Sequence, residues 1–208
     1  MLYFAYGSNM PRTYFRDRCP DSEFRGKALL KGYRIDFLYR STSWPGGGAA
    51  DIVKEPTFPS DETEAERENK SSEELGRGEV SCRESDAGQR VEEASGVGVG
   101  VSGGVRVGGV GGVGVWGILY NISANDLKLL DQYEDVEEGG YRRIEVEVLH
   151  EGNLVKALSY EVVDKLEKSL KPKSGYLKLM VEAAERNRFP HEYIAEIIQV
   201  SNGNNMTY

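Results

Sequence analysis

Two short segments of the sequence carry residue types that could do chemistry, and the first is a turn near the N-terminus. The apolar run 2–5 predicts a strand, and Tyr6-Gly7-Ser8-Asn9-Met10 follows it directly. A glycine and small polar residues at the end of a strand turn successive backbone N–H groups outward, and such a concavity attracts a carboxylate, a phosphate or an oxyanion. Turn composition by itself favours an ordinary connecting turn, so a functional interpretation of this turn needs a second element.

The second segment is a run of carboxylates within residues 131–138, where a predicted helix gives way to a strand. Most such acids are solvated surface charges. Glu134 differs because it lies one turn beyond Leu130 and next to Tyr133, at the apolar edge of the helix, so its carboxylate can face inward. Desolvation raises the pKa of a carboxyl group toward the range where it can accept and donate a proton near pH 7. Glu134 is therefore the candidate general acid and base.

Strands must position both segments. Short apolar runs and period-2 alternation predict strands at 2–5, 27–31, 34–39, 48–54, 115–122, 141–149 and 155–163. The turn at Gly152 and Asn153 predicts a hairpin between the last two strands. Strands 27–31 and 34–39 are joined near Gly32, and 48–54 and 115–122 become neighbours across a second hairpin if the segment between them is excised.

Helices complete the expected fold. Ser123 followed by Asp126 is typical of a helix N-cap with an acidic first turn, and this helix should end near Glu134. Pro11 suits the first position of a helix after the first turn, and Pro190 suits the same position in a C-terminal helix at 190–200. A further helix is expected from 174 to about 188. The sum is one α+β domain of about 150 ordered residues, with a mostly antiparallel sheet or barrel and helices packed on one side.

Residues 56–112 interrupt this domain with an expected disordered insertion. Its first part is acidic: residues 55–95 contain 13 acidic and 5 basic residues, so their net charge of −8 equals that of the whole chain. A segment with this composition buries too little apolar surface to offset its ordering entropy. Residues 96–115 then hold 10 of the 25 glycines among alternating valines, which argues against a stable strand. A self-contained interaction module is the alternative interpretation of the insertion.

Composition also limits the partners and the compartment. Outside the acidic segment the charges balance, so no basic surface for nucleic acid is expected. Cys19 and Cys82 lie far apart, which gives neither a disulfide framework nor a metal-ligand spacing. No apolar stretch approaches the roughly 18 residues of a membrane span, and no signal peptide is apparent. We therefore expect a soluble, cytoplasmic protein without metal.

Together these motifs resemble the γ-glutamylcyclotransferase-like proteins, a family also called AIG2-like. The resemblance covers the chain outside residues 56–112. It rests on segments that match in order, namely Tyr6-Gly7-Ser8-Asn9, Gly47-Gly48-Ala49, Val115-Trp116-Gly117, Leu130-Asp131 through Glu134, Gly139 with Tyr141, Ser174-Gly175-Tyr176, and Asn187-Arg188-Phe189-Pro190 with Tyr193.

The resemblance implies a mixed, barrel-like α/β domain without cofactor, a small γ-glutamyl compound as substrate, and an intramolecular aminolysis of lyase or acyltransferase type. The α-amine of the γ-glutamyl group would attack its own γ-carbonyl and release 5-oxoproline together with the linked amine. Gly7, Ser8 and Asn9 would provide backbone amides for the substrate, and Glu134 would be the general acid and base. Tyr6 and Tyr176 would bind substrate through their phenol groups, although core packing is an equal alternative for both.

Three functions remain open on this resemblance. In the first, the substrate is a γ-glutamyl amino acid or a glutathione-like peptide. In the second, it is a γ-glutamyl amine. In the third, the chain is a non-catalytic binding or regulatory protein that keeps the pocket and uses the acidic insertion as a contact surface. One departure bears on the choice. Asp135 stands where the family commonly has glycine, which alters the loop if that position needs a positive φ and raises the pKa of Glu134 if both carboxylates face the pocket.

Overall fold

A barrel of short strands carries the fold in the computed structural model, which describes residues 1–55 and 114–203. The predicted insertion at 56–112 lies outside the described residues. The strands in the described part are β1 (Leu2–Ala5), β2 (Glu23–Lys31), β3 (Tyr33–Arg40), β4 (Gly48–Lys54), β5 (Gly114–Asn121), β6 (Tyr141–His150) and β7 (Asn153–Val162). The helices there are α1 (Arg12–Arg18), α3 (Ala124–Tyr133), α4 (Ser174–Arg186) and α5 (His191–Ser201).

Five strands close the barrel in the order β1-β5-β2-β6-β7. All of their pairings are antiparallel except the closing one, in which β7 runs parallel to β1 at Leu158 and Tyr3. The expected hairpin between β6 and β7 is confirmed, and it extends to His150 opposite Asn153. The fold is therefore the predicted α+β class, with a mixed and mostly antiparallel barrel.

The expected hairpin between 48–54 and 115–122 is wrong. β4 pairs with β3 in a separate two-stranded sheet, from Tyr33 opposite Lys54 to Arg40 opposite Gly48, while β5 lies between β1 and β2. The physical reason is proximity along the chain, because a short loop between β3 and β4 closes at a lower entropic cost than any pairing across the long insertion. β2 and β3, although consecutive, belong to different sheets.

Close packing of β5 against β1 depends on Gly117. A Cβ atom at this position would lie 2.5 Å from the carbonyl oxygen of Ala5 and 2.6 Å from the ring of Phe4. Next to this contact, aromatic rings from three elements stack in the core: the ring of Phe15 lies 4.1 Å from that of Tyr120 and 5.4 Å from that of Tyr3, measured between centroids. This stack fixes α1, and with it the turn that precedes α1, against the barrel.

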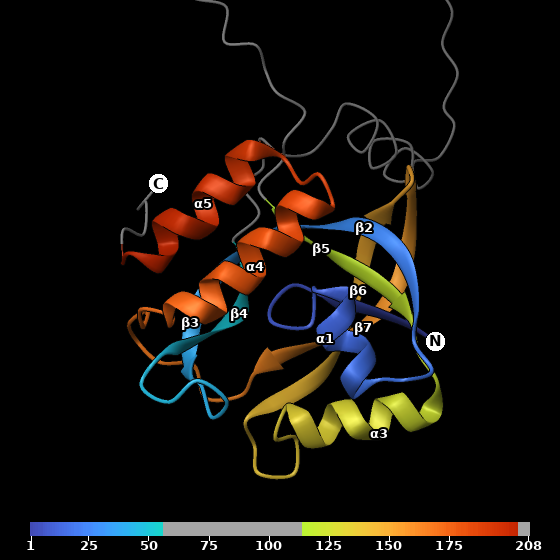
Figure 1. Ribbon diagram of the computed structural model, residues 1–208, viewed down its shortest axis with the longest axis horizontal. Helices are drawn as coiled ribbons and strands as arrows, with labels where there is room; N and C mark the ends of the chain where they lie inside the picture. Colours follow the sequence, from blue (N-terminus) through green and yellow to red (C-terminus); the bar gives the residue numbers. More distant parts are fainter. Residues whose placement is uncertain (56–113, 204–208) are drawn as a thin grey trace, which may run out of the picture. The chain divides into compact units, whose positions relative to one another are not determined.

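The expected packing of the helices on one side is wrong: in the described part they form two pairs on different sides of the barrel, α1 with α3 and α4 with α5 near β3 (Figure 1). α3 begins as predicted, because the Ser123 side chain accepts from the Asp126 amide while the Asp126 carboxylate accepts from the Ser123 amide. This reciprocal capping satisfies donors that would otherwise be free at the first turn. Pro11 and Pro190 are the N-caps of α1 and α5, so each of these helices begins one residue later than expected.

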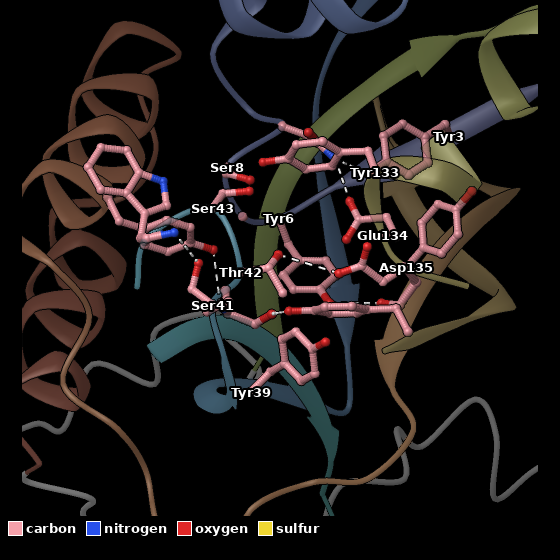
Figure 2. A pocket seen from close by; sticks show the side chains of 18 residues that line it. Tyr3, Tyr6, Ser8, Tyr39, Ser41, Thr42, Ser43, Tyr133, Glu134 and Asp135 are labelled. Carbon is pink, nitrogen blue, oxygen red and sulfur yellow. Dashed lines mark hydrogen bonds between the residues drawn. The ribbon is translucent and has the colours of Figure 1, made fainter. Parts of the chain in front are cut away.

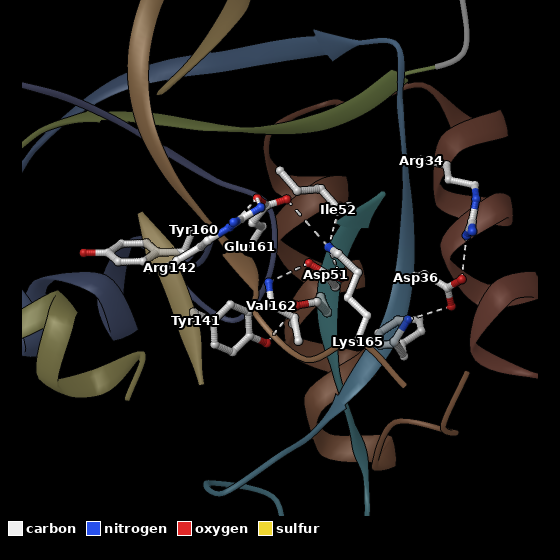
Figure 3. A network of polar contacts seen from close by, with 12 residues as sticks. Arg34, Asp36, Asp51, Ile52, Tyr141, Arg142, Tyr160, Glu161, Val162 and Lys165 are labelled. Carbon is white, nitrogen blue, oxygen red and sulfur yellow. Dashed lines mark hydrogen bonds and ion pairs between the residues drawn. The ribbon is translucent and has the colours of Figure 1, made fainter. Parts of the chain in front are cut away.

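A polar network ties the two-stranded sheet to the barrel (Figure 3). Asp51 of β4 is fully buried and accepts a hydrogen bond of 3.0 Å from the Val162 amide of β7 and one of 2.5 Å from the Lys165 ammonium. Lys165 also donates to the Ile52 carbonyl at 3.0 Å. β4 is thereby held beside the open end of the barrel, where it forms one wall of the pocket described next.

Candidate active site

One pocket lies where the turn after β1, the end of α3 and the loop after β3 meet (Figure 2). Figure 2 shows Glu134 and Asp135 on one side of it and the hydroxyl side chains of residues 41–43 on the other. Seven tyrosines supply much of the remaining wall, namely Tyr3, Tyr6, Tyr39, Tyr133, Tyr141, Tyr160 and Tyr176. The pocket is therefore polar and aromatic, with its carboxylates on one side.

All six residues that the sequence nominates line this pocket. They are Tyr6, Gly7, Ser8, Asn9, Glu134 and Tyr176. They come from the first turn, the end of α3 and the start of α4, segments that are far apart in the sequence. Their roles stay predictions, but their convergence is a property of the fold.

Backbone hydrogen bonds hold Glu134 in place. It is the C-cap of α3; its amide donates to the Leu130 carbonyl at 2.8 Å, and its own carbonyl accepts from the Tyr141 amide at 3.1 Å. The next residue, Asp135, has φ of 51°, the left-handed region that glycine favours. The loop does need a positive φ at this position, and the chain supplies it with an aspartate whose carboxylate also faces the pocket.

The Glu134 carboxylate is joined to the first turn by the side chain of Asn9. Asn9 Nδ2 donates to Glu134 Oε1 at 2.8 Å and to the Tyr3 hydroxyl at 2.9 Å. Desolvation raises the pKa of Glu134 to about 7, opposed by the Asn9 hydrogen bond and by the charge of Arg18, and assisted by Asp135. No buried side-chain nitrogen or oxygen lacks a partner in the described residues. Oε2, for which no hydrogen bond is found there, is thus accessible from the pocket.

The turn itself is tight and anchored at both ends. The Met10 amide donates to the Gly7 carbonyl at 3.1 Å, and the Tyr120 hydroxyl donates to the Met10 carbonyl at 2.8 Å. A Cβ atom on Gly7 would lie 3.1 Å from the Tyr176 hydroxyl, so a larger residue here would displace the phenol. The glycine therefore allows the turn and α4 to approach each other.

The two predicted substrate-binding phenols differ in what they can offer. The Tyr6 hydroxyl donates its hydrogen to the Tyr160 carbonyl at 2.8 Å, which leaves only its oxygen as an acceptor. The Tyr176 hydroxyl instead accepts from the Ala50 amide at 3.0 Å, so its hydrogen remains available to a ligand. Burial raises the pKa of both phenols, which keeps them protonated near neutral pH.

Sequence reasoning missed several parts of the pocket. It assigned Asn9 a backbone role only, whereas the side chain reaches Glu134. It did not nominate the loop with Ser41, Thr42 and Ser43, or Tyr141, whose hydroxyl donates to the Ala50 carbonyl at 2.9 Å. The number of tyrosines, 12 in the chain, was the available signal. It does not say which of them converge.

Within the described ranges, 1–55 and 114–203, no three His, Cys, Asp or Glu side chains come together as ligands for a metal ion. No helix in the same ranges is both long and apolar enough to cross a membrane.

Comparison with known proteins shows which family the chain is similar to. A model of the AIG2-like family matches residues 114–197, which include α3, Glu134 and Tyr176. The gamma-glutamylcyclotransferases of Bos taurus and Homo sapiens are each 25% identical to the chain over 197 residues, covering 92% of it and 74% of each relative. These matches support the resemblance of the chain to the AIG2-like, γ-glutamylcyclotransferase-like family.

Solved structures share the fold of this chain. A structure named gamma-glutamyl cyclotransferase superposes with a TM-score of 0.65 at 23% identity, over all of this chain and 91% of the other. An uncharacterized protein from Homo sapiens superposes with a TM-score of 0.63 at 24% identity, over 95% of this chain and 85% of the other. At these identities the likeness concerns the fold, and the chemistry is argued from the pocket.

Proposed function

We propose that this protein is a cyclotransferase that converts a γ-glutamyl compound to 5-oxoproline and releases the linked amine. One observation carries the proposal: Glu134, with its pKa raised to about 7, is held by Asn9 of the first turn at 2.8 Å and faces the pocket that this turn lines. The names of the relatives support the same reaction class.

The raised pKa suits the proton transfer that this reaction needs. An α-amine titrates near 8 and an ordinary glutamate near 4.3, so an ordinary carboxylate would be too weak a base by roughly 5 kcal/mol. At about 7 the difference from the amine falls to roughly one unit, or about 1.4 kcal/mol. Glu134 would take the proton from the α-amine as the new C–N bond forms, and give it to the leaving nitrogen as the old C–N bond breaks. No water or cofactor enters this balance.

The remaining groups would bind the substrate and stabilise the oxyanion. The γ-carbonyl oxygen gains negative charge as the amine adds, and donors fixed in advance lower the energy of that state. The Tyr176 hydroxyl and the backbone amides of the turn Gly7–Asn9 are donors that line the pocket. Because nucleophile and carbonyl belong to one molecule, the protein needs only to hold the γ-glutamyl group in a ring-like pose.

A specific observation favours γ-glutamyl amines over γ-glutamyl amino acids as substrates. Among the described residues, the pocket lining contains two carboxylates, Glu134 and Asp135, and no lysine or arginine. Asp135 lies across from the hydroxyl of Thr42, at 3.4 Å. A leaving group with its own carboxylate would meet like charge there, whereas a leaving group with a second amine would meet attraction.

The test is the formation of 5-oxoproline, measured by mass spectrometry with purified full-length protein. The panel is glutathione, γ-glutamylalanine and ε-(γ-glutamyl)lysine, with α-glutamylalanine as the negative control because its γ-carboxyl carries no leaving amine. We expect 5-oxoproline from at least one γ-glutamyl compound and none from the α-linked control. No product from any of them would contradict the proposal and favour the non-catalytic binding function.

A matched pair of variants ties the activity to the site. Glu134→Gln should abolish product formation, and Glu137→Gln should retain it, since Glu137 is an exposed carboxylate of the same loop. Equal activity in both variants would remove the assignment of Glu134.

A further inference from the structure

Arg18 is the last residue of α1 and does not line the pocket. Its Nη1 donates to Asn9 Oδ1 at 2.5 Å, and its Nη2 donates to the Tyr133 hydroxyl at 2.6 Å. The guanidinium also lies 3.6 Å from the centroid of the Tyr133 ring. These contacts join α1 to α3, on either side of the Asn9 side chain.

The chemistry of the guanidinium decides which way the Asn9 amide points. An arginine side chain has only donors, so it must face the amide oxygen, and the amide NH2 must then face the other way. The two hydrogens of that NH2 are both used, one by Tyr3 and one by Glu134. With the amide reversed, its oxygen would face the Glu134 carboxylate and its NH2 would face the guanidinium, and both contacts would be repulsive.

We infer that Arg18 is a positioning residue: through Asn9 it fixes Glu134 Oε1 and leaves Oε2 to exchange the proton. The inference rests on the proposed role of Glu134 as the base. It adds that the orientation of this base is set from outside the pocket, by a residue that need not touch the substrate. Loss of Arg18 should therefore impair turnover and leave substrate binding nearly unchanged.

The charges around Glu134 make the consequence measurable between pH 5 and 9. Burial raises the pKa of six surrounding phenols and of the Cys19 thiol, so these groups stay protonated in this range; the phenols are those of Tyr3, Tyr6, Tyr39, Tyr141, Tyr160 and Tyr176. The remaining charged neighbours are Arg18, which lowers the pKa of Glu134, and Asp135, which raises it. Removal of Arg18 must then raise the pKa of Glu134.

The main experiment compares Arg18→Met, which keeps the apolar stem, with Arg16→Met, an exposed arginine of the same helix. For Arg18→Met we expect kcat to fall roughly tenfold, as for a lost hydrogen bond to a charged group, with KM within about twofold of wild type. The rising limb of the kcat profile should move to higher pH. Arg16→Met should match wild type in all three. A rise in KM with kcat unchanged would overturn the inference.

A double-mutant cycle tests whether Arg18 acts through Asn9. In an Asn9→Ala background the amide is gone, so Arg18→Met should lower kcat by less than about twofold. A merely structural contribution of Arg18 would persist there, and an undiminished tenfold loss would overturn the inference. Arg18→Lys, which keeps a cationic donor, should recover part of the lost kcat; a Lys variant as slow as the Met variant would count against the inference.

A measurement without substrate separates this inference from the proposed function. The carboxyl pKa of Glu134 can be followed by 13C NMR of glutamate-labelled protein, with the signal assigned from Glu134→Gln. We expect a higher pKa in Arg18→Met and no change in Arg16→Met, whether or not any γ-glutamyl compound is converted. An unchanged pKa in Arg18→Met would overturn the coupling even if the enzyme activity is found.

Discussion

Asp51 is a fully buried carboxylate and Glu134 a half-buried one, and the two have different partners. Both oxygens of Asp51 are occupied, one by the Val162 amide and one by the Lys165 ammonium. Glu134 has one oxygen bound to the neutral Asn9 amide and the other open to the pocket. Burial raises the pKa of both, but at Asp51 a bound cation and two backbone hydrogen bonds oppose the rise.

The difference separates a carboxylate that holds the fold from one that can exchange a proton. A buried ion whose acceptors are all filled contributes to structure, and breaking one partner leaves an uncompensated charge. A desolvated carboxylate with a free oxygen is poised to change its protonation state near pH 7. Variants of the two carboxylates should therefore differ in what they change.

The largest effect is expected on turnover in Glu134→Gln. Loss of a general acid and base typically costs 10²–10⁴-fold, so we expect a fall in kcat of roughly 10³-fold, measured as the rate of 5-oxoproline formation. The fold should be retained, because glutamine keeps an oxygen that accepts from Asn9. A Glu134→Gln protein with more than about a tenth of wild-type kcat would contradict the role of Glu134 in proton exchange.

The matching exchange at Asp51 should act on stability instead. Asp51→Asn removes the partner of Lys165, and we expect the free energy of unfolding in urea to fall by about 2 kcal/mol, less than for a fully buried pair because Lys165 is 31% exposed. The pH profile of the remaining activity should match wild type. Asp17→Asn, an exposed exchange on α1, is the control. An Asp51→Asn protein as stable as wild type would mean that this network is not structural.

Glu134→Gln should also change how stability depends on pH. The folded-state pKa of about 7 lies above the ordinary value of 4.5, so between these values the folded protein binds more protons than the unfolded chain. Wild type therefore loses stability as pH rises through this window. The variant should match wild type near pH 4 and be more stable by about 2 kcal/mol at pH 8, as measured by urea unfolding. Parallel curves for the two proteins would contradict the raised pKa.

The smallest effect is expected at Asp135, the carboxylate that shares the pocket. Asp135→Asn keeps the size of the side chain and should lower the preference for a leaving group with a second amine over one with a carboxylate alone by about fivefold, in line with a partly solvated charge pair. The measurement is the ratio of kcat/KM for ε-(γ-glutamyl)lysine and γ-glutamylalanine. Asp135→Asn should also move the rising limb of the pH profile of kcat to slightly lower pH, since Asp135 raises the pKa of Glu134. An unchanged ratio would remove the charge argument for γ-glutamyl amines.

Much of the local structure could be predicted from the sequence. The capping pair of Ser123 and Asp126, the end of α3 at Glu134 and the hairpin of β6 with β7 all follow from short-range patterns, and all are confirmed. The partner of β4 was predicted wrongly, because pairing across a long insertion cannot be weighed from alternation alone.

Caps, periodicity and turn residues act over a few neighbours, so the elements, the candidate turn and the candidate base follow from the sequence. The hydrogen bonds of the Asn9 side chain to Glu134 and to Arg18 depend on the folded chain. Glu134 lies 125 positions from Asn9 along the chain and Arg18 lies 9 positions from it, yet each is joined to the Asn9 side chain by a hydrogen bond. The raised pKa of Glu134 is likewise a tertiary property, since it depends on the strands and helices that surround its carboxylate and limit its contact with water.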